Sequence, residues 1–314
     1  MRRYVARRLV AFAVTLVVVS VLVFVVIRVM PGDPALLVLG VEASPEAAVA
    51  LRRAMGLDRP LPVQYAEWVT AAVRGDLGRS IQYDVPVAGL VASRLRVTLP
   101  LTLLAAGFMV TAALPLGVYA ATHHRRPGDY AALVLSQLGI AVPSFWAGLL
   151  LILAFAVRLG WFQAGGFAGW EAGPGPALRS LLLPALALGL IQAAVLTRTT
   201  RAAMLEVLHA EYVRTARAKG LGERAVTWKH AVRNALITIV TIVGLQLGQL
   251  MAGSIVLENV FYLPGLGRLV LGAITARDLP VVQGAVVFVA ATIVALNFAV
   301  DLLYGWLDPR IRYE

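Results

Sequence analysis

Six stretches of this chain contain no Asp, Glu, Lys, Arg or His. Each is long enough to cross about 30 Å of hydrocarbon as an α-helix. Charge or Gly/Pro residues follow every stretch, which marks where each helix ends. The sequence therefore predicts an all-α integral membrane protein with six transmembrane helices. The stretches are Val10–Ile27, Val97–Thr122, Tyr130–Val157, Ser180–Thr197, Asn234–Leu257 and Leu279–Val300.

The composition supports this class. Of the 314 residues, 60% are hydrophobic and only 14% are charged. A soluble domain has about 25% charged residues, so the apolar surface of this chain must meet lipid. The formal net charge is +11, but the basic residues lie between the apolar stretches. That placement favours signals for membrane orientation over binding of nucleic acid.

The first apolar stretch has an alternative interpretation as a signal peptide, because Arg2, Arg3, Arg7 and Arg8 precede it. At 18 residues, however, Val10–Ile27 is longer than the usual apolar region of a signal peptide. No small-x-small cleavage site follows it. A retained transmembrane helix is the favoured interpretation.

Basic residues orient the bundle. Connections on one side of the predicted membrane contain sixteen of them: Arg2, Arg3, Arg7, Arg8, Arg125, Arg126, Arg198, Arg201, Arg214, Arg217, Lys219, Arg224, Lys229, Arg233, Arg310 and Arg312. The short connections on the other side contain only Arg158, Arg179, Arg268 and Arg277. Cytoplasmic loops carry the excess of Lys and Arg, so we expect both termini and the loop 198–233 in the cytoplasm.

These spans divide the chain into four parts. Residues 1–30 are the cytoplasmic N-terminus and first helix, and 31–96 are an extracytoplasmic segment. Residues 97–306 are a five-helix transmembrane core that includes the loop 198–233, and 307–314 are a cytoplasmic tail. In the extracytoplasmic segment, Ser44-Pro45-Glu46 precedes an amphipathic pattern and predicts a helix capped by Ser44. Aromatic residues on the same side fit a membrane-interface belt better than a ligand cage: Trp161, Phe162, Phe167 and Trp170.

Polar and helix-breaking residues occur inside the spans. Proline frees a backbone carbonyl, so kinks are expected at Pro100, Pro115, Pro143 and Pro184. The fifth span contains Gly244, Gly248 and Gly253 beside two glutamines, which indicates either close helix packing or a water-filled path. For Asp301, at the end of the last span, an interfacial ion pair is favoured over a proton relay. The residues assigned to a translocation path are Gln137, Ser144, Gln192, Gln246, Gln249 and Asn297.

Several chemistries are excluded by absent residues. The chain has no cysteine, which excludes disulfides, thiolate metal sites and thiol catalysis. It contains neither a P-loop nor an H-E-x-x-H motif, so it has no P-loop nucleotide site. The four histidines all fall in predicted cytoplasmic loops, and no charge lies in the middle of a span. An intramembrane Ser–His protease and a proton-coupled carrier are therefore disfavoured.

The loop between the fourth and fifth spans is expected to form a helix and a turn. Apolar residues recur at helical spacing, with charged residues on the other faces: Met204, Leu205, Leu208, Tyr212 and Ala216. Gly220 is then expected to stop the helix, and Gly222 to permit a turn. The resulting surface is basic and partly apolar. It suits anionic lipid headgroups and a groove on a soluble partner equally well.

The residues of this loop carry a family resemblance. Glu211-Tyr-Val-Arg-Thr-Ala-Arg-Ala-Lys-Gly220-Leu221, followed by His230-Ala-Val-Arg-Asn-Ala-Leu236, resembles the cytoplasmic loop of ABC importer permeases, above all the dipeptide/oligopeptide and nickel branch. Further similar stretches run along the whole chain: Met30–Pro34, Gly75–Ser80, Pro264–Gly267, Arg277–Gly284 and Asp308–Tyr313. One departure is Arg214-Thr215-Ala216, where the general family pattern has Glu-Ala-Ala. This variant points to the peptide branch.

The resemblance implies a type I ABC importer permease-like bundle without catalytic residues or a metal site. Its loop would be a coupling helix that docks in a groove of a cytoplasmic ATPase subunit, and ATP and Mg would bind to those partner subunits. Apolar groove contacts are expected from Tyr212, Thr215, Ala216, Ala218 and Leu221, and a charged rim from Arg214, Arg217 and Lys219. Glu211 has an alternative role, pairing with Arg214 or Thr215 within the helix.

The implied partners are a second homologous permease subunit, two ATPase subunits, an extracytoplasmic solute-binding protein, a peptide substrate and membrane lipid. The implied location is a bacterial or archaeal inner or plasma membrane. Alternatives remain at this point. The solute is a peptide, a nickel chelate or another small molecule, and the permease pair is a heterodimer or a homodimer. A self-sufficient secondary carrier and a membrane enzyme are the rivals from other classes.

Overall fold

The computed structural model describes residues 2–29, 39, 44–54 and 56–307. Within these residues the regular structure is helical, and the only β feature is an isolated bridge between Arg79 and Pro86. The predicted all-α class is confirmed. The motifs Met30–Pro34 and Asp308–Tyr313, and the side chain of Asp301, lie outside the described residues.

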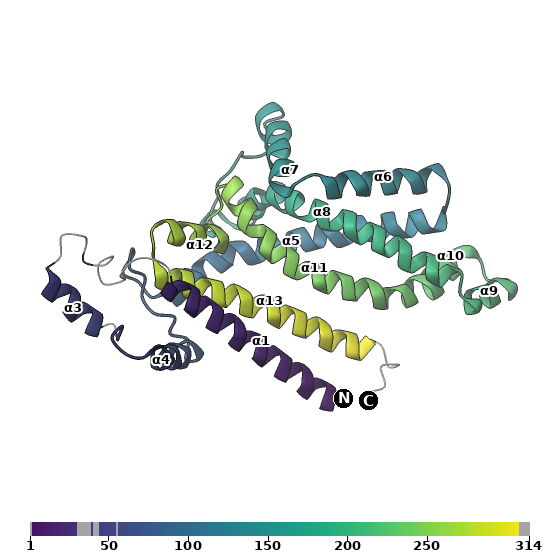
Figure 1. Cartoon of the computed structure of the whole chain (residues 1–314). Coiled ribbons are helices and arrows are strands. Elements are labelled where there is room, and N and C mark those ends of the chain that lie inside the picture. The colour runs from purple at the N-terminus through teal and green to yellow at the C-terminus, as the bar shows by residue number, and fades with distance from the viewer. Residues whose placement is uncertain (1, 30–38, 40–43, 55, 308–314) are drawn as a thin grey trace. The chain divides into compact units, whose positions relative to one another are not determined.

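Among the described residues, five helices are long and apolar enough to cross a membrane (Figure 1). They are α1 (Arg2–Val29), α5 (Val87–Thr122), α8 (Pro174–Leu208), α11 (Arg233–Val260) and α13 (Leu279–Leu307). Each contains one predicted span. Helix α8 does not end with its apolar stretch at Thr197 but continues to Leu208. Part of the predicted cytoplasmic loop is therefore an extension of a transmembrane helix.

The third predicted span, Tyr130–Val157, is not one straight helix. It is a pair of helical segments bent by 101°: α6 (Pro127–Ala141), then α7 (Ser144–Leu151) with the π-helical segment η1 (Ile152–Arg158). Proline disfavours helical geometry in the residue before it, and Val142, which precedes Pro143, is extended with φ −86° and ψ 120°. By contrast, Pro100 and Pro115 remain inside α5, and Pro184 inside α8. The six predicted spans are thus five helices and one bent pair.

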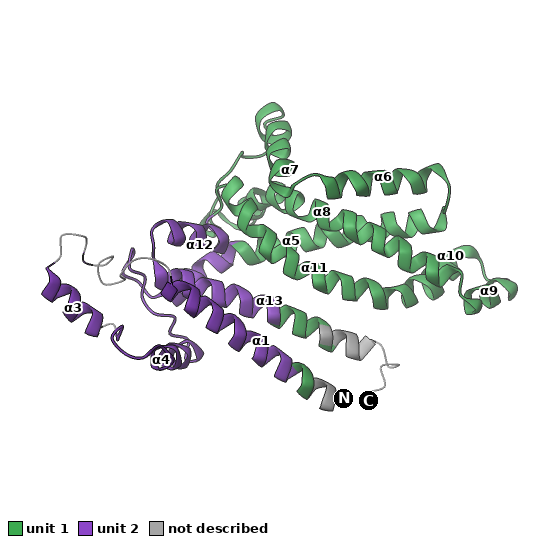
Figure 2. Ribbon diagram, viewed as in Figure 1, with its two compact units in different colours: residues 1–8, 98–263, 295–314 green, residues 9–97, 264–294 purple. Residues whose placement is uncertain are grey.

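The chain forms two compact units, coloured in Figure 2. One unit contains residues 1–8, 98–263 and 295–314, and the other contains residues 9–97 and 264–294. The four-part division by membrane sidedness stays a prediction.

In the unit of residues 9–97 and 264–294, two of the short helices pack against long ones. Helix α3 (Pro45–Ala54) begins as predicted, because Ser44 Oγ accepts the N–H of Ala47 at 3.2 Å. Helix α4 (Leu61–Val73) is joined to α1 by a 2.7 Å hydrogen bond between the hydroxyls of Tyr65 and Ser20. Helix α12 (Leu266–Thr275) buries its apolar face in a cluster with residues from the beginnings of α5 and α13. Buried members of this cluster are Val87, Val91, Leu266, Leu269, Val270, Ala273, Val281 and Ala285.

Two of the family-like motifs meet in this same unit. The carboxylate of Asp278 is 1% exposed and accepts the hydroxyl of Ser80. It also accepts the backbone N–H groups of Ile81 and Gln82, each at 3.1 Å. A buried carboxylate needs such donors to offset its lost hydration. The motifs Gly75–Ser80 and Arg277–Gly284 are therefore joined by hydrogen bonds to one buried carboxylate.

In the other unit, α8 is the central helix and packs against α6, α7 and α11. Close approach depends on glycine. A Cβ atom at Gly117 of α5 would lie 2.6 Å from the side chain of Thr200, and one at Gly244 of α11 would lie 2.1 Å from Val300 of α13. A Cβ at Gly253 would meet Leu188 at 3.0 Å. For these glycines of the fifth span, helix packing is the better supported of the two interpretations.

Candidate functional site

The candidate coupling element, residues 209–225, follows directly from α8. After Leu208, the chain makes a break at His209 and Ala210, and a second helix, α9, runs from Glu211 to Ala218. Ala210 is extended, with φ −69° and ψ 146°. The single helical stripe expected from Met204 to Ala216 is therefore wrong, because this break resets the helical phase. Figure 1 shows α9 and α10 (Glu223–Ala225) past the ends of α8 and α11.

One face of α9 is fixed to its own chain. Val213 is fully buried and Ala216 is 6% exposed, and both cluster with the buried Val226. Val226 opens the π-helical segment η3 (Val226–Val232), which leads into α11. The candidate coupling element is thus attached to two transmembrane helices, through α8 before it and through η3 after it.

Gly220 ends α9, as predicted. Its φ of +79° lies in the left-handed region that glycine adopts without strain. The N–H of Gly220 donates to Arg217 O at 2.9 Å, and the N–H of Leu221 donates to Ala216 O at 3.3 Å. This pair of bonds is a Schellman motif, which satisfies the last carbonyls of the helix.

The other face of α9 points away from the chain and mixes apolar and basic groups. Tyr212 is 45% exposed and Leu221 is 37% exposed. Further exposed residues are Arg214, Thr215, Arg217, Ala218 and Lys219. Ala216, expected at the partner groove, instead faces inward. Its position is explained by packing within the chain.

Two ion pairs cross this surface. Arg214 Nη1 lies 2.8 Å from Glu211 Oε1, so the expected pairing within the helix is formed. Arg217 Nε lies 2.8 Å from Glu223 Oε1 and ties α9 to α10. Exposed pairs of this kind contribute only about 0–1 kcal/mol each. They orient the side chains more than they stabilise the fold.

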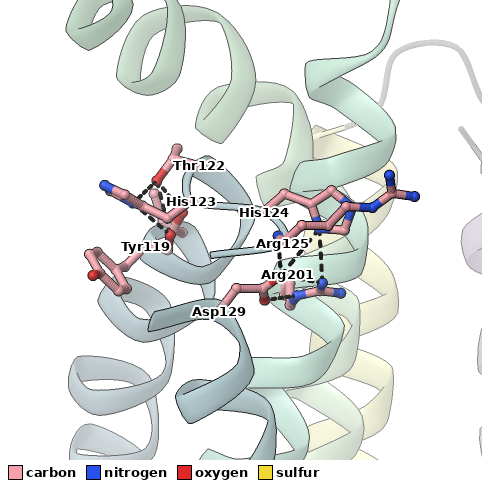
Figure 3. Close-up of polar contacts among 8 residues, drawn as sticks. Tyr119, Thr122, His123, His124, Arg125, Asp129 and Arg201 are labelled. Atoms are coloured by element: carbon pink, nitrogen blue, oxygen red, sulfur yellow. Dashed lines mark hydrogen bonds and ion pairs between the residues drawn. The ribbon is translucent and has the colours of Figure 1, made fainter. Parts of the chain in front are cut away.

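A buried ion pair lies at the same end of the unit (Figure 3). Asp129, in the first turn of α6, is 1% exposed. Arg201 of α8 binds both of its oxygens, Nη2 at 2.8 Å and Nε at a shorter distance. The backbone N–H of Arg125 donates to Asp129 Oδ2 at 2.9 Å, and His124 Nδ1 lies 3.2 Å from the same oxygen.

A cavity of about 650 Å³ separates the end of α5 from the coupling element. Its walls include His123 after α5, His209 after α8, and Arg217 and Trp228 from the loop. His123 stacks on Tyr119 with ring centroids 4.3 Å apart.

The polar residues assigned to a path differ in their exposure and in their partners. Gln246 is 4% exposed, and its Nε2 donates to the backbone carbonyl of Gln192 at 3.2 Å. Gln137 is exposed and lies 3.4 Å from Arg198 Nη1. Gln249 is exposed, and Ser144, Gln192 and Asn297 are half-buried. Their role in a path stays a prediction.

Sequence reasoning missed three buried acids. Asp129 directly precedes the third apolar stretch, and Glu258 directly follows the fifth. Glu258 is fully buried and accepts the hydroxyl of Thr98 at 2.6 Å. Asp278 lies just before the sixth stretch. Their positions in the sequence could have identified them, because each acid lies directly before or after an apolar stretch. In the described part of the chain, no three His, Cys, Asp or Glu side chains are grouped as a metal site.

The sequence of the chain matches a family of membrane transport components. Residues 113–313 match the family described as binding-protein-dependent transport system inner membrane component, and residues 1–102 match the N-terminal region of such membrane components. The chain belongs to this family. It is a multi-pass membrane protein and a permease subunit of a transport system.

Individual relatives cover nearly the whole chain. It is 44% identical, over 95% of both chains, to a Brucella abortus (strain 2308) protein described as a candidate peptide transport system permease. It is 41% identical, over the full length of both, to the glutathione transport system permease protein GsiC of Escherichia coli (strain K12).

A solved structure supports the fold alone. An inward-facing conformation of the MetNI methionine ABC transporter matches with a TM-score of 0.60 and 18% identity, covering 70% of this chain and 96% of that one. The expected type I importer permease-like fold is confirmed.

Proposed function

We propose that this chain is the transmembrane permease subunit of an ATP-driven ABC importer for peptides of the dipeptide or oligopeptide class. It forms half of the translocation pathway and receives motion from separate ATPase subunits. The observation that carries this proposal is α9, a short helix whose inner face is packed on its own chain and whose outer face is exposed. An exposed apolar tip surrounded by cations is suited to docking in a groove on a protein.

The partners follow from the family. Two ATPase subunits bind ATP and Mg²⁺ and hydrolyse the nucleotide, a second permease subunit completes the pathway, and a solute-binding protein delivers the substrate. The chain itself holds no cofactor and performs no catalysis. The pairing is a heterodimer, and both termini face the cytoplasm of a bacterial or archaeal cell, as the distribution of Arg and Lys favours.

Mechanically, closure of the ATPase subunits on ATP draws the two coupling helices together and tilts the bundles from inward-facing to outward-facing. Helix α9 suits this role because Val213, Ala216 and Val226 fix it to the chain. A loosely attached docking helix would absorb the displacement. A fixed one passes it to α8 and α11.

Peptide as the solute is supported by two relatives, one described as a peptide transport permease and the other as a glutathione transport permease. A nickel chelate or another small solute is the second candidate. Uptake competition with the cognate binding protein present separates them: excess dipeptide or oligopeptide should suppress uptake, whereas suppression only by a nickel chelate would contradict the peptide assignment.

The docking role is tested by the double variant Tyr212→Asp, Leu221→Asp. Both side chains lie on the outer face of α9, whereas Ala216 is buried, so a bulky charge there would dislodge the helix. We expect loss of co-purification with the ATPase subunits, or ATP hydrolysis without uptake. Tyr83→Asp is the matched control, since Tyr83 is 54% exposed and lies in the predicted extracytoplasmic segment. Normal coupled uptake by the double variant would refute the docking role.

A further inference from the structure

The buried pair of Asp129 and Arg201 joins two parts of the chain that are 72 residues apart. Asp129 starts α6, and Arg201 lies on α8 about two turns before that helix ends at Leu208. Figure 3 shows the two side chains pointing at each other, with His124 and Arg125 of the connecting loop beside them.

The chemistry of the pair makes it hard to break. Asp129 is 1% exposed, and the side chain of Arg201 is 17% exposed. Removing one partner would leave the other charge with little access to water, which is strongly unfavourable. The pair also fixes the loop, because Arg125 donates its N–H to Asp129 while holding a left-handed φ of +62°. The Asp129 carboxylate therefore fixes the conformation of this loop.

The surroundings show what the pair connects. Beyond Arg201, helix α8 leads without a break to Leu208 and then to α9. Beside it, the end of α5 faces the coupling element across the cavity of about 650 Å³. At this end of the unit, the ion pair adds a buried polar contact between the loop and α8 to the packing of α6 on α8.

We propose that Asp129 and Arg201 are positioning residues for transport, which make the loop 123–126 and the first turn of α6 move with the coupling end of α8. The inference rests on the proposed function. Through this pair, displacement of α9 reaches the bent third span as well as α8 and α11. Without it, the loop and the start of α6 lag behind the coupling element.

The first test compares transport with ATP hydrolysis in the complete complex in vesicles. Asp129→Asn and Arg201→Gln should still assemble with the ATPase subunits and hydrolyse ATP. Their uptake per ATP hydrolysed should fall by about two- to thirtyfold, which corresponds to the roughly 0.5–2 kcal/mol by which such residues modulate coupling. Glu206→Gln is the matched control, an exposed carboxylate on the same helix. Wild-type coupling in both variants would overturn the inference.

The second test measures the motion directly and does not depend on the stability of those variants. The chain has no cysteine, so Arg126→Cys and Glu206→Cys give two unique labelling sites, both exposed. In the otherwise unchanged complex, the distance between spin labels there should be the same with and without ATP. In the Asp129→Asn background it should differ between the two states. A distance that changes with ATP in the unchanged complex overturns the inference, even where Asp129→Asn fails to assemble.

The two hypotheses fail in different ways. A wild-type complex without ATP-driven uptake would count against the proposed function. A wild-type complex that is coupled, beside an Asp129→Asn complex coupled equally well, counts against the positioning pair alone.

Discussion

Tyr212 and Val213 are neighbours in sequence and have opposite roles. Val213 is fully buried and holds α9 to the chain, whereas Tyr212 is 45% exposed on the outer face. Ala216, one turn later, is on the buried side. A partner that docks on α9 therefore meets a different set of side chains from the set that keeps α9 in place.

Gly220 and Gly222 offer a matched pair for testing how α9 is terminated. No atom lies within 4 Å of a Cβ built on either one, but only Gly220 has a positive φ. Gly220→Ala should destabilise the end of α9 by about 1 kcal/mol, because a side chain is disfavoured in left-handed geometry. Amide hydrogen exchange of residues 211–218 should then be about fivefold faster, since about 1.4 kcal/mol corresponds to a factor of ten. Equal acceleration by Gly222→Ala would show that φ is not the cause.

Among the helices, the packing of α11 depends on the absence of a side chain at one position. A Cβ at Gly244 would lie 2.1 Å from Val300 Cγ1 of α13, whereas a Cβ at Gly107 of α5 would meet nothing within 4 Å. Gly244→Ala should cost about 1–3 kcal/mol through overpacking. Gly107→Ala should be neutral or slightly stabilising, because alanine is the better helix former. Thermal unfolding in detergent measures both, and equal stability of the two variants would contradict this packing.

Local signals allowed most of the helices to be predicted. Five apolar stretches predicted α1, α5, α8, α11 and α13, because a helix in lipid needs only its own residues to satisfy its backbone. Ser44 and Gly220 were read correctly for the same reason, since a cap bonds within one turn. The bend after Ala141 was underestimated. Four prolines gave the same local signal, but Pro100, Pro115 and Pro184 lie inside helices and only Pro143 lies at a break between two.

Local sequence patterns did not predict the buried polar clusters. Asp129 pairs with a residue 72 positions away, and Asp278 with one 198 positions away. No periodicity links such partners, so the acids read as loop residues at the ends of apolar stretches. The stripe across residues 204–216 failed for a related reason, because a break of two residues changes which side chains share a face.

For the molecule as a whole, docking of α9 on a cytoplasmic ATPase subunit requires a fixed orientation in the membrane. Introduced cysteines are unique in this chain, so Tyr83→Cys and Arg126→Cys report opposite sides. In intact cells stripped of any outer membrane, a membrane-impermeant maleimide should label Tyr83→Cys and should label Arg126→Cys only after lysis. The reverse pattern would invert the positive-inside assignment and place α9 away from any cytoplasmic ATPase.

Coupled uptake in reconstituted vesicles tests directly whether this subunit carries solute by receiving motion through α9. Peptide uptake and ATP hydrolysis would be measured together, with the chain alone, with its partners, and with the Tyr212→Asp, Leu221→Asp variant. The account predicts uptake only when the ATPase subunits, ATP and the binding protein are all present, and its loss in the variant. Uptake by the chain alone, driven by an ion gradient without ATP, would contradict it.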